Sequence, residues 1–382
     1  QSVAPKDWAL FDLPEKAFSV SMPGKPKRNK IFEKQAQNSG WNFTVYDCTD
    51  LSAGLYYLMQ VRDIEPGHFL EGDSLYFSSF SENMGGDGTE TFNEQFSTID
   101  GFPAMRLDAL NGKESLFYKT KNIIRGNRVY SMMVLGNISK KDEKGPDRFF
   151  DSFRMSDYQA PEVKTYSSDD LTFSTVAPGK FVIAKKEEYE QEDSTRKHYT
   201  CYSPNDAVSY ELLKDYLPKY YWSADDTTFY KEKANAYKAY TDSVLSYTKV
   251  SNGNLRGVEQ IVQLQGSNNL RKVRFLLHGD TLYTLITYVP TQYINNKEHT
   301  AFFDQFRVKN DNITTTAFNS KATQLFKALQ EKDSTTFEEA KTYLSSATFS
   351  KQDLPFLHQA LLYNYQDDTL NYGSVTSKLI LA

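Results

Sequence analysis

The chain has 382 residues, a formal net charge of -5 and 14% aromatic residues, with 26 Phe and 26 Tyr. This length predicts two or three domains, and the aromatic content favours β-rich packed cores over a disordered chain. The mild charge excludes a strong electrostatic footprint for nucleic acid, and no run reaches the roughly 18 apolar residues of a membrane helix. We therefore expect no nucleic-acid partner and no transmembrane segment.

The sequence starts with QSVAPKDW, without an initiator methionine, and continues rich in Ser, Thr, Asn and Tyr. Such a start is typical of a chain from which an export signal has been removed, or of a chain that was trimmed. We expect an exported protein, located in the periplasm or cell envelope of a bacterium.

The first part of the chain predicts a mixture of strands and short helices. Phe18–Met22 alternates apolar and polar side chains, which is the pattern of a half-buried strand. The RGN turn around Gly126 is a hairpin signal. In chain order, the expected elements are strands at 18–22, 41–48 and 54–61, a partly helical segment at 73–96, strands at 102–110, 116–124 and 128–135, and a helix at 149–153.

The same order of elements returns at a constant shift of 153 residues, which carries Phe149 onto Phe302. FFDSFR at 149–154 then lies over FFDQFR at 302–307, and Cys48 lies over Cys201. A period this long indicates duplicated domains. We predict copy 1 at 11–156 and copy 2 at 166–309, joined by a short polar linker. A residue shared by both copies is expected to serve the fold.

The remaining segment, 312–382, lacks both the hairpin and the closing Phe-Arg phrase, and it predicts helices. Thr335 and Glu338 have capping-box spacing, and Asp353 precedes a Leu-Pro pair that can open a helix. The chain ends on the apolar residues LILA. Two interpretations are open: this segment is the start of a longer helical array, or its last helix docks on its neighbours. A helical stripe is formed by Phe318, Ala322, Leu325, Phe326 and Leu329.

Three short motifs of copy 1 resemble the PsbP domain, the fold of a photosystem II extrinsic subunit and of a Ran-binding nuclear transport factor. They are F-x-V-x-x-P at Phe18–Pro23, G-x-x-x-Y at Gly126–Tyr130 and S-F-R at Ser152–Arg154. The resemblance implies an antiparallel sheet flanked by helices in each copy. The predicted fold class is α+β, with two tandem antiparallel sheets flanked by helices and an all-α C-terminal segment. A shared fold transfers no function.

One phrase suggests an enzyme. GDSL at Gly72–Leu75 carries the nucleophile in GDSL esterases, which would make Ser74 a catalytic serine. No His in the chain has Asp three residues before it, so the base of that family is missing. The repeat places Asp73–Ser74 over Asp226–Thr227, and Asp with Ser or Thr is ordinary N-cap chemistry. We expect these pairs to cap helices, and we predict no catalytic residue.

No His or Cys spacing indicates a metal site, and no glycine-rich loop indicates a nucleotide, so we predict no cofactor. Cys48 and Cys201 are expected to be free buried thiols, with a disulfide as the alternative. Arg154 and Arg307 could bind an anion. The simpler expectation is that each pairs with the Asp three residues earlier on its helix.

Aromatic residues crowd the stretch DYLPKYYW at Asp215–Trp222. Such a cluster can stack on sugar rings or on the side chains of a partner, and it is also typical of a small core under a loop. We predict an exported, non-catalytic envelope protein that acts as a binding or protein-interaction module for an unknown protein or glycan. The alternatives are a hydrolase and a small-molecule or lipid binder using a cleft between the copies. The candidate interaction surface comprises Tyr216, Tyr220, Tyr221 and Trp222.

Overall fold

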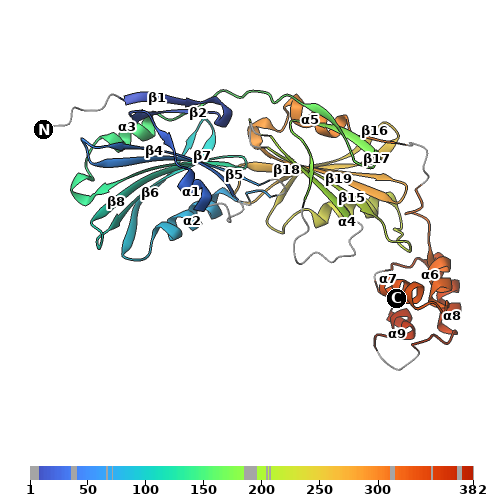
Figure 1. Ribbon diagram of the computed structural model, residues 1–382. Coiled ribbons are helices and arrows are strands. Elements are labelled where there is room, and N and C mark those ends of the chain that lie inside the picture. Colours follow the sequence, from blue (N-terminus) through green and yellow to red (C-terminus); the bar gives the residue numbers. More distant parts are fainter. Residues whose placement is uncertain are drawn as a thin grey trace.

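The computed structural model describes residues 8–35, 41–65, 68–70, 72–184, 196–203, 205, 208–309, 315–345, 347–367 and 372–381. Two α+β units, which we call copy 1 and copy 2, lie next to each other, and a group of helices follows (Figure 1). Within the described residues, each copy holds a seven-stranded and a three-stranded sheet, and all strand pairs are antiparallel. This confirms the predicted fold class.

The larger sheet of copy 1 has the strand order β3-β4-β5-β9-β8-β7-β6. Its strands are β3 (Lys27–Arg28), β4 (Trp41–Asp50), β5 (Leu55–Ile64), β6 (Thr89–Ile99), β7 (Phe102–Asn111), β8 (Leu116–Arg125) and β9 (Arg128–Asn137). The smaller sheet contains β1 (Trp8–Leu13), β2 (Phe18–Pro23) and β10 (Arg154–Met155). The α-helices are α1 (Lys30–Gln35), α2 (Asp73–Met84) and α3 (Gly145–Asp151).

Copy 2 repeats this order as β13-β14-β15-β19-β18-β17-β16. Its larger sheet contains β13 (Val182–Ile183), β14 (Arg196–Tyr202), β15 (Ser209–Tyr216), β16 (Ser243–Asn252), β17 (Leu255–Gln263), β18 (Asn269–His278) and β19 (Thr281–Pro290). Its smaller sheet contains β11 (Lys164–Ser167), β12 (Phe173–Ala177) and β20 (Arg307–Val308). The α-helices are α4 (Asp226–Ala236) and α5 (Lys297–Asp304).

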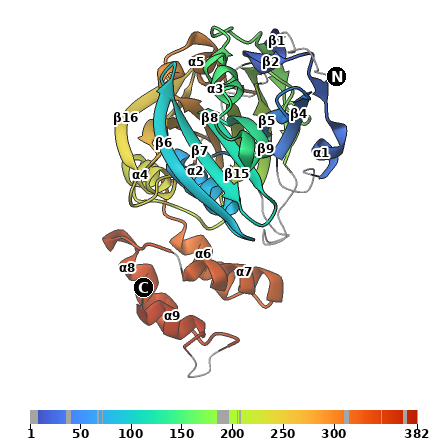
Figure 2. The same cartoon turned by 90° about the vertical axis from the view of Figure 1, so that its left-hand side faces the viewer.

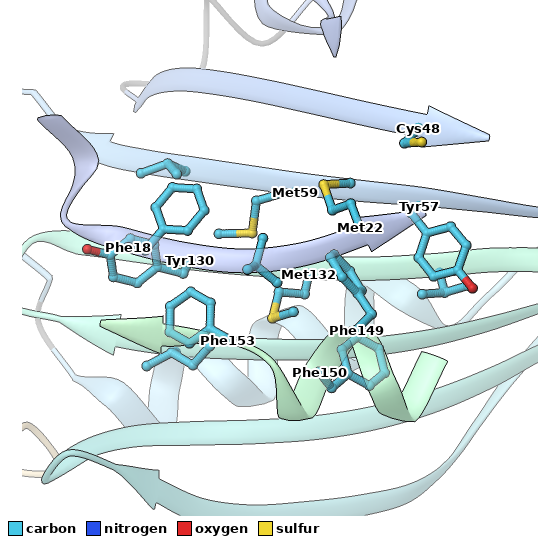
Figure 3. Close-up of a cluster of buried hydrophobic side chains, with 14 of the residues drawn as sticks. Phe18, Met22, Cys48, Tyr57, Met59, Tyr130, Met132, Phe149, Phe150 and Phe153 are labelled. Atoms are coloured by element: carbon cyan, nitrogen blue, oxygen red, sulfur yellow. The ribbon is translucent and has the colours of Figure 1, made fainter. Parts of the chain in front are cut away.

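The repeated Phe-rich phrase forms the centre of each core. Figure 3 shows Phe149, Phe150 and Phe153 pointing from α3 and the residues after it towards Phe18, Met59 and Met132. Phe153 and its equivalent Phe306 are 2% and 0% exposed, so both side chains are buried in their cores. The alternation of β2 therefore places its apolar side chains in this layer.

The opposite face of each large sheet is covered by one helix. In copy 1, Phe77 of α2 packs on Met105, Leu107 and Ile124. In copy 2, α4 covers the sheet in the same way with Phe229. The central strands of each large sheet are therefore covered on both faces, whereas the edge strands β6 and β16 are largely exposed. Helices α2 and α4 begin at equivalent positions of their copies. Those two helix starts define the site described below.

The described residues of the C-terminal segment form α6 (Ala322–Leu329), α7 (Ser334–Leu344), α8 (Leu354–Leu361) and α9 (Val375–Leu381), as expected for a helical segment. We call α6 to α9 the helical segment, and Figure 2 shows it outside the two sheets. The capping box expected at Thr335 is wrong, because Asp333 is the N-cap of α7 and accepts from Thr336 N.

Candidate functional site: the junction between the two copies

The N-terminus of α2 in copy 1 is capped by copy 2. Backbone N–H groups of Asp73 and Ser74 donate to the carbonyl oxygen of Gly266, at 2.8 and 3.3 Å. The carboxylate of Asp73 accepts from Asn268 N at 2.5 Å. The N-cap position is Gly72, which makes no side-chain cap. The expectation that Asp73 or Ser74 caps its own helix is therefore wrong, because the free N–H groups find a partner in the other copy.

The equivalent helix of copy 2 has a local cap. Asp225 is the N-cap of α4, and its carboxylate accepts from Thr228 N at 2.7 Å. We expected Asp226 or Thr227 in this role, so the prediction is wrong by one residue. The helix itself begins where the repeat placed it, and side-chain capping is the ordinary solution for an exposed helix start.

Asp73 is 6% exposed, and burial raises the pKa of its carboxyl to about 6 although the Asn268 N–H opposes this shift. Its second oxygen, Oδ1, is buried without a hydrogen-bond partner among the described residues. A buried carboxylate with one unsatisfied oxygen favours its protonated form. The junction therefore contains a group that titrates in the mildly acidic range.

Aromatic contacts join the copies next to this cap. Phe69 of copy 1 stacks on Tyr288 of copy 2, with ring centroids 3.9 Å apart and planes at 7°. Arg125 Nη2 donates to the hydroxyl of Tyr293 in copy 2 at 3.1 Å, and its guanidinium lies 5.8 Å from the ring centroid of Tyr293. Stacked rings and cation–π contacts contribute stability beyond the area that they bury.

A buried ion cluster completes the junction. Asp63 binds Arg128 at 2.6 Å and Lys16 at 2.7 Å within copy 1. The hydroxyl of Tyr202 in copy 2 donates to the same carboxylate at 3.1 Å. Burial alone would raise the pKa of Asp63, but Arg128 and Lys16 hold it below its ordinary value. The carboxylate therefore stays charged and accepts a hydrogen bond across the junction.

A groove of 640 Å³ opens beside the α2 cap, with walls from both copies. Leu75 is 59% exposed on the copy 1 side. On the copy 2 side, Arg271 and Asp242 form an ion pair at 3.4 Å. The volume lies within the range of about 300–1,000 Å³ typical of ligand sites. The lining residues are Phe69, Gly72, Ser74, Leu75, Ala239, Thr241, Asp242, Leu264, Gln265, Gly266 and Arg271.

Ser74, the candidate nucleophile, lies in the wall of this groove. None of the lining residues is a histidine, so the groove offers Ser74 no imidazole base. The N–H of Ser74 donates to Gly266, at the start of a helix in an antiparallel design.

The four aromatic residues of the candidate interaction surface point in different directions. Tyr220 and Trp222 are buried at 2% and 6% exposure and pack on the helical segment, with Trp222 5.5 Å from Phe349. Tyr221 packs on the core under α4. Tyr216 is 44% exposed. Three of the four therefore pack within the chain, and a role for these residues towards an outside partner stays a prediction.

Equivalent positions of the two copies contact the unit that follows each copy in the chain: copy 2 after copy 1, and the helical segment after copy 2. The shift of 153 residues carries Phe69, which stacks on copy 2, onto Trp222, which packs on the helical segment. It also carries Asn127 onto Asp280. Asp280 accepts from Thr316 N and Oγ1 at 3.3 and 2.9 Å, at the entry to the helical segment. The sequence signal for this role was a large aromatic residue at equivalent positions of both copies.

The two arginines of the repeated phrase do not pair with the Asp side chains as expected. Arg154 Nη1 donates to the backbone carbonyls of Asp151 and Phe153 at 2.6 and 2.7 Å. Arg307 does the same at its own helix, while the Asp304 carboxylate binds Arg274. The ion-pair prediction is wrong because free carbonyls at a helix C-terminus are the nearer acceptors.

Cys48 and Cys201 are buried thiols that form no disulfide, as expected. Burial raises the pKa of the Cys201 thiol to about 12, and Cys48 Sγ donates to the carbonyl of Pro23 at 2.7 Å. Both thiols are therefore poor nucleophiles.

In the part of the chain that the structure describes, no three His, Cys, Asp or Glu side chains gather as a metal site. No helix within these ranges has the length and apolar character needed to cross a bilayer.

No family model and no curated protein matches this chain. Among solved structures, cyanobacterial PsbP (CyanoP) from Synechocystis sp. PCC 6803 is 8% identical, covers 41% of this chain and 98% of its own, and has a TM-score of 0.30. A protein from Bacteroides thetaiotaomicron VPI-5482 is 12% identical, with 53% and 69% covered and a TM-score of 0.27. Immunity protein TplEi of T6SS from Pseudomonas aeruginosa is 10% identical, with 79% and 97% covered and a TM-score of 0.22. The chain resembles PsbP at the level of the fold, and these likenesses carry nothing further.

Proposed function

We propose that this protein is a non-catalytic, exported binding protein of a bacterial envelope, and that the groove between its copies holds a segment of a partner protein. The observation that carries the proposal is the groove itself, 640 Å³ in volume and built jointly by the two copies. A groove with walls from two units exists only while the units are joined, so the proposed binding would depend on the junction.

The chemistry of the groove fits a protein segment. Leu75 and Phe69 offer apolar surface, and Leu75 is 59% exposed. Arg271 and Asp242 offer paired charges at the opposite wall. Protein interfaces combine such apolar anchors with a polar rim. The cap on α2 and the stacking of Phe69 on Tyr288 hold the walls in place, which lowers the entropy cost of binding.

A small apolar molecule or lipid is the second candidate occupant. The volume of the groove supports it, since it lies in the range of about 300–1,000 Å³ that such ligands need. A hydrolase has less support, because the groove offers Ser74 no imidazole base.

Photo-crosslinking in the native cell tests the proposal. A photoreactive amino acid replaces Leu75 in the groove, and in a control it replaces Leu51, which is 72% exposed on copy 1 and does not line the groove. We expect a discrete protein adduct from position 75 and none from position 51. Adducts of equal yield at both positions, or lipid as the only adduct at position 75, would contradict a protein occupant. Cell fractionation tests export, and recovery in the cytoplasm alone would refute it.

A further inference from the structure

Strand β16 forms a long open edge of copy 2. Among the described strands it ends the order of the large sheet, and β17 is its single neighbour. It has ten residues, whereas β13 at the opposite edge has two. Figure 2 shows β16 in yellow at one side of the molecule, beside α4. A long edge presents a row of unpaired backbone N–H and C=O groups, to which an extended peptide can add as a further strand.

The two-residue turn between β16 and β17 determines which backbone groups of β16 point outward. Asn252 and Leu255 flank this turn and form the first pair of the hairpin. The pair at a two-residue turn is hydrogen-bonded, and bonded and non-bonded pairs then alternate along the strands. Tyr247, Lys249 and Ser251 therefore stand in non-bonded pairs, so their N–H and C=O groups point away from β17.

A groove of 540 Å³ lies beside this edge, between the β16–β17 hairpin and the start of α4, and we call it the β16 groove. Its buried apolar lining includes Tyr230 of α4 and Val258 of β17, at 6% and 2% exposure. Tyr247, Lys249 and Ser251 also line it. The residues whose backbone points outward are therefore the ones whose side chains face the groove, as alternation along a strand allows.

Copy 1 differs at this place. The shift of 153 residues carries Phe96 onto Lys249 and Phe77 onto Tyr230, and Phe96 and Lys249 hold equivalent positions in the register of their sheets. The ring centroid of Phe96 lies 6.0 Å from that of Phe77 on α2. An aromatic side chain thus lies against the helix in copy 1, and a lysine replaces it in copy 2. The shared fold does not require this lysine, since copy 1 folds with phenylalanine.

The charge of the hairpin indicates what the edge can accept. Residues 243–258 contain Lys249 and Arg256 and no Asp or Glu. Both cations are exposed, and neither forms an ion pair within the described ranges. Asp226, on the α4 wall, is the single acidic residue among the lining, so two cations stand against one acid. The β16 groove therefore favours an acidic side chain over a basic one.

We propose that the β16 edge binds an extended, acidic segment of a partner protein as an added strand. An apolar side chain of this segment enters the β16 groove, and a carboxylate pairs with Lys249 and Arg256. In this binding mode the backbone bonds supply affinity, and the pockets for alternate side chains supply specificity. The site belongs to copy 2 alone, so it is a second binding site and does not rest on the groove between the copies.

A phage-displayed library of random linear peptides, selected on the full chain, tests the proposal. We expect the enriched peptides to carry acidic and large apolar residues at alternate positions. Backbone hydrogen exchange at Tyr247, Lys249 and Ser251 should slow when such a peptide is bound, because added-strand bonds protect these N–H groups. A selection that enriches no peptide, enriched peptides without acidic residues, or unchanged exchange in β16 would each overturn the proposal.

Variants of β16 separate the groove from the rest of the edge. Lys249→Phe introduces the residue of copy 1 and should weaken peptide binding by more than about tenfold, because it removes the charge and fills the groove. Thr248→Phe is the matched control, since it adds the same side chain to the opposite face of the strand and should bind as the wild type does. Equal or tighter binding by Lys249→Phe would show that Lys249 blocks strand addition, and the proposal would be wrong.

Two further variants test the charge and the backbone separately. Arg256→Gln leaves the groove open and should weaken binding of the acidic peptides, but not of analogues with Gln in place of Glu. Tyr247→Pro removes one outward N–H, which an edge strand tolerates, and should weaken binding of both peptide types. If neither variant affects binding, the peptide binds elsewhere and the proposed edge is wrong.

Sedimentation equilibrium of the wild type distinguishes a partner protein from a second copy of this chain. We expect a mass of one chain, 43.8 kDa. A larger mass that returns to one chain in Lys249→Phe would assign the β16 edge to another copy, against the proposal. Leu75 does not line the β16 groove, so failure of these tests leaves the crosslinking test of the groove between the copies intact.

Discussion

In copy 1, helix α2 begins against a turn of copy 2, and Gly266 caps its N–H groups. In copy 2, helix α4 begins at the equivalent place, and its own Asp225 caps it. The two helix starts share the letters Asp-Ser and Asp-Thr, and both copies share the fold around them. The difference lies in the neighbour, because the start of α2 meets a turn of copy 2, whereas the start of α4 is exposed. Equivalent polar residues of a repeat can therefore bind within their own copy in one case and bind the neighbouring copy in the other.

Each copy also presents one large aromatic side chain to the unit that follows it in the chain. Copy 1 presents Phe69 to a β-sheet unit, and copy 2 presents Trp222 to a bundle of helices. The next unit differs in kind, yet a large aromatic side chain makes the contact in both. Aromatic rings supply large rigid contact area to partners of different shape. In both copies, the next unit of the chain therefore packs against the same face, at the equivalent positions Phe69 and Trp222.

The largest expected effect concerns the part that the copies share. Phe153→Ala and Phe306→Ala should each lower the free energy of unfolding by about 3–5 kcal/mol, because each leaves a cavity in a closed core. The two side chains are 2% and 0% exposed, so their losses should be similar. Urea unfolding of each variant measures this. A loss in one copy and none in the other would show that the two cores are not equivalent.

The next effect separates the two junctions. Trp222→Ala removes a 6% exposed ring from the contact with the helical segment and should cost about 3 kcal/mol of local stability. Limited proteolysis should then release the helical segment faster than in the wild type. Phe69→Ala, at the equivalent position, should weaken the contact between the copies and leave this release unchanged. If both variants release the helical segment equally fast, the contact between the copies and the contact with the helical segment are not independent.

A smaller effect depends on pH. The pKa of Asp73 is raised from 3.8 to about 6 in the folded protein, so the folded state binds more protons than the unfolded state between these values. The stability that protonated Asp73 contributes is complete below pH 3.8 and is lost as the pH rises through about 6. Asp73→Asn keeps an acceptor for Asn268 N and removes the charge. We expect it to raise the free energy of unfolding at pH 7 by about 1–3 kcal/mol and to have little effect at pH 4.

Asp226→Asn is the matched control, since Asp226 occupies the equivalent position at the exposed start of α4. Its unfolding free energy should follow that of the wild type at both pH values. If Asp73→Asn destabilises the protein at pH 7, the carboxylate is charged and favourable at the junction, and the role assigned to burial is wrong. Urea midpoints at pH 4 and pH 7 decide between these outcomes.

The sequence was sufficient for those features that depend on local pattern. The shift from Phe149 to Phe302 predicted two copies, and the alternation in β2 predicted its buried side. The capping of α2 could not be read in this way, because Asp73 and Gly266 are far apart in the chain and meet only when the copies dock. The burial of Trp222 could not be predicted for the same reason, since it packs on the helical segment, which is far away in the chain.

The smallest expected effect concerns Ser74, the residue with the most specific enzymatic motif. Its side chain is exposed at the edge of the groove, and its N–H, which Ala also has, makes the contact with Gly266. Ser74→Ala should therefore change the free energy of unfolding by less than about 0.5 kcal/mol, as is usual for exposed positions. The pure protein should hydrolyse p-nitrophenyl acetate no faster than buffer, because no histidine lines the groove to take the serine proton. Hydrolysis that Ser74→Ala abolishes without unfolding the protein would make the groove an active site. The start of α2 would then differ from the start of α4 because Ser74 acts as a nucleophile at the junction of the copies.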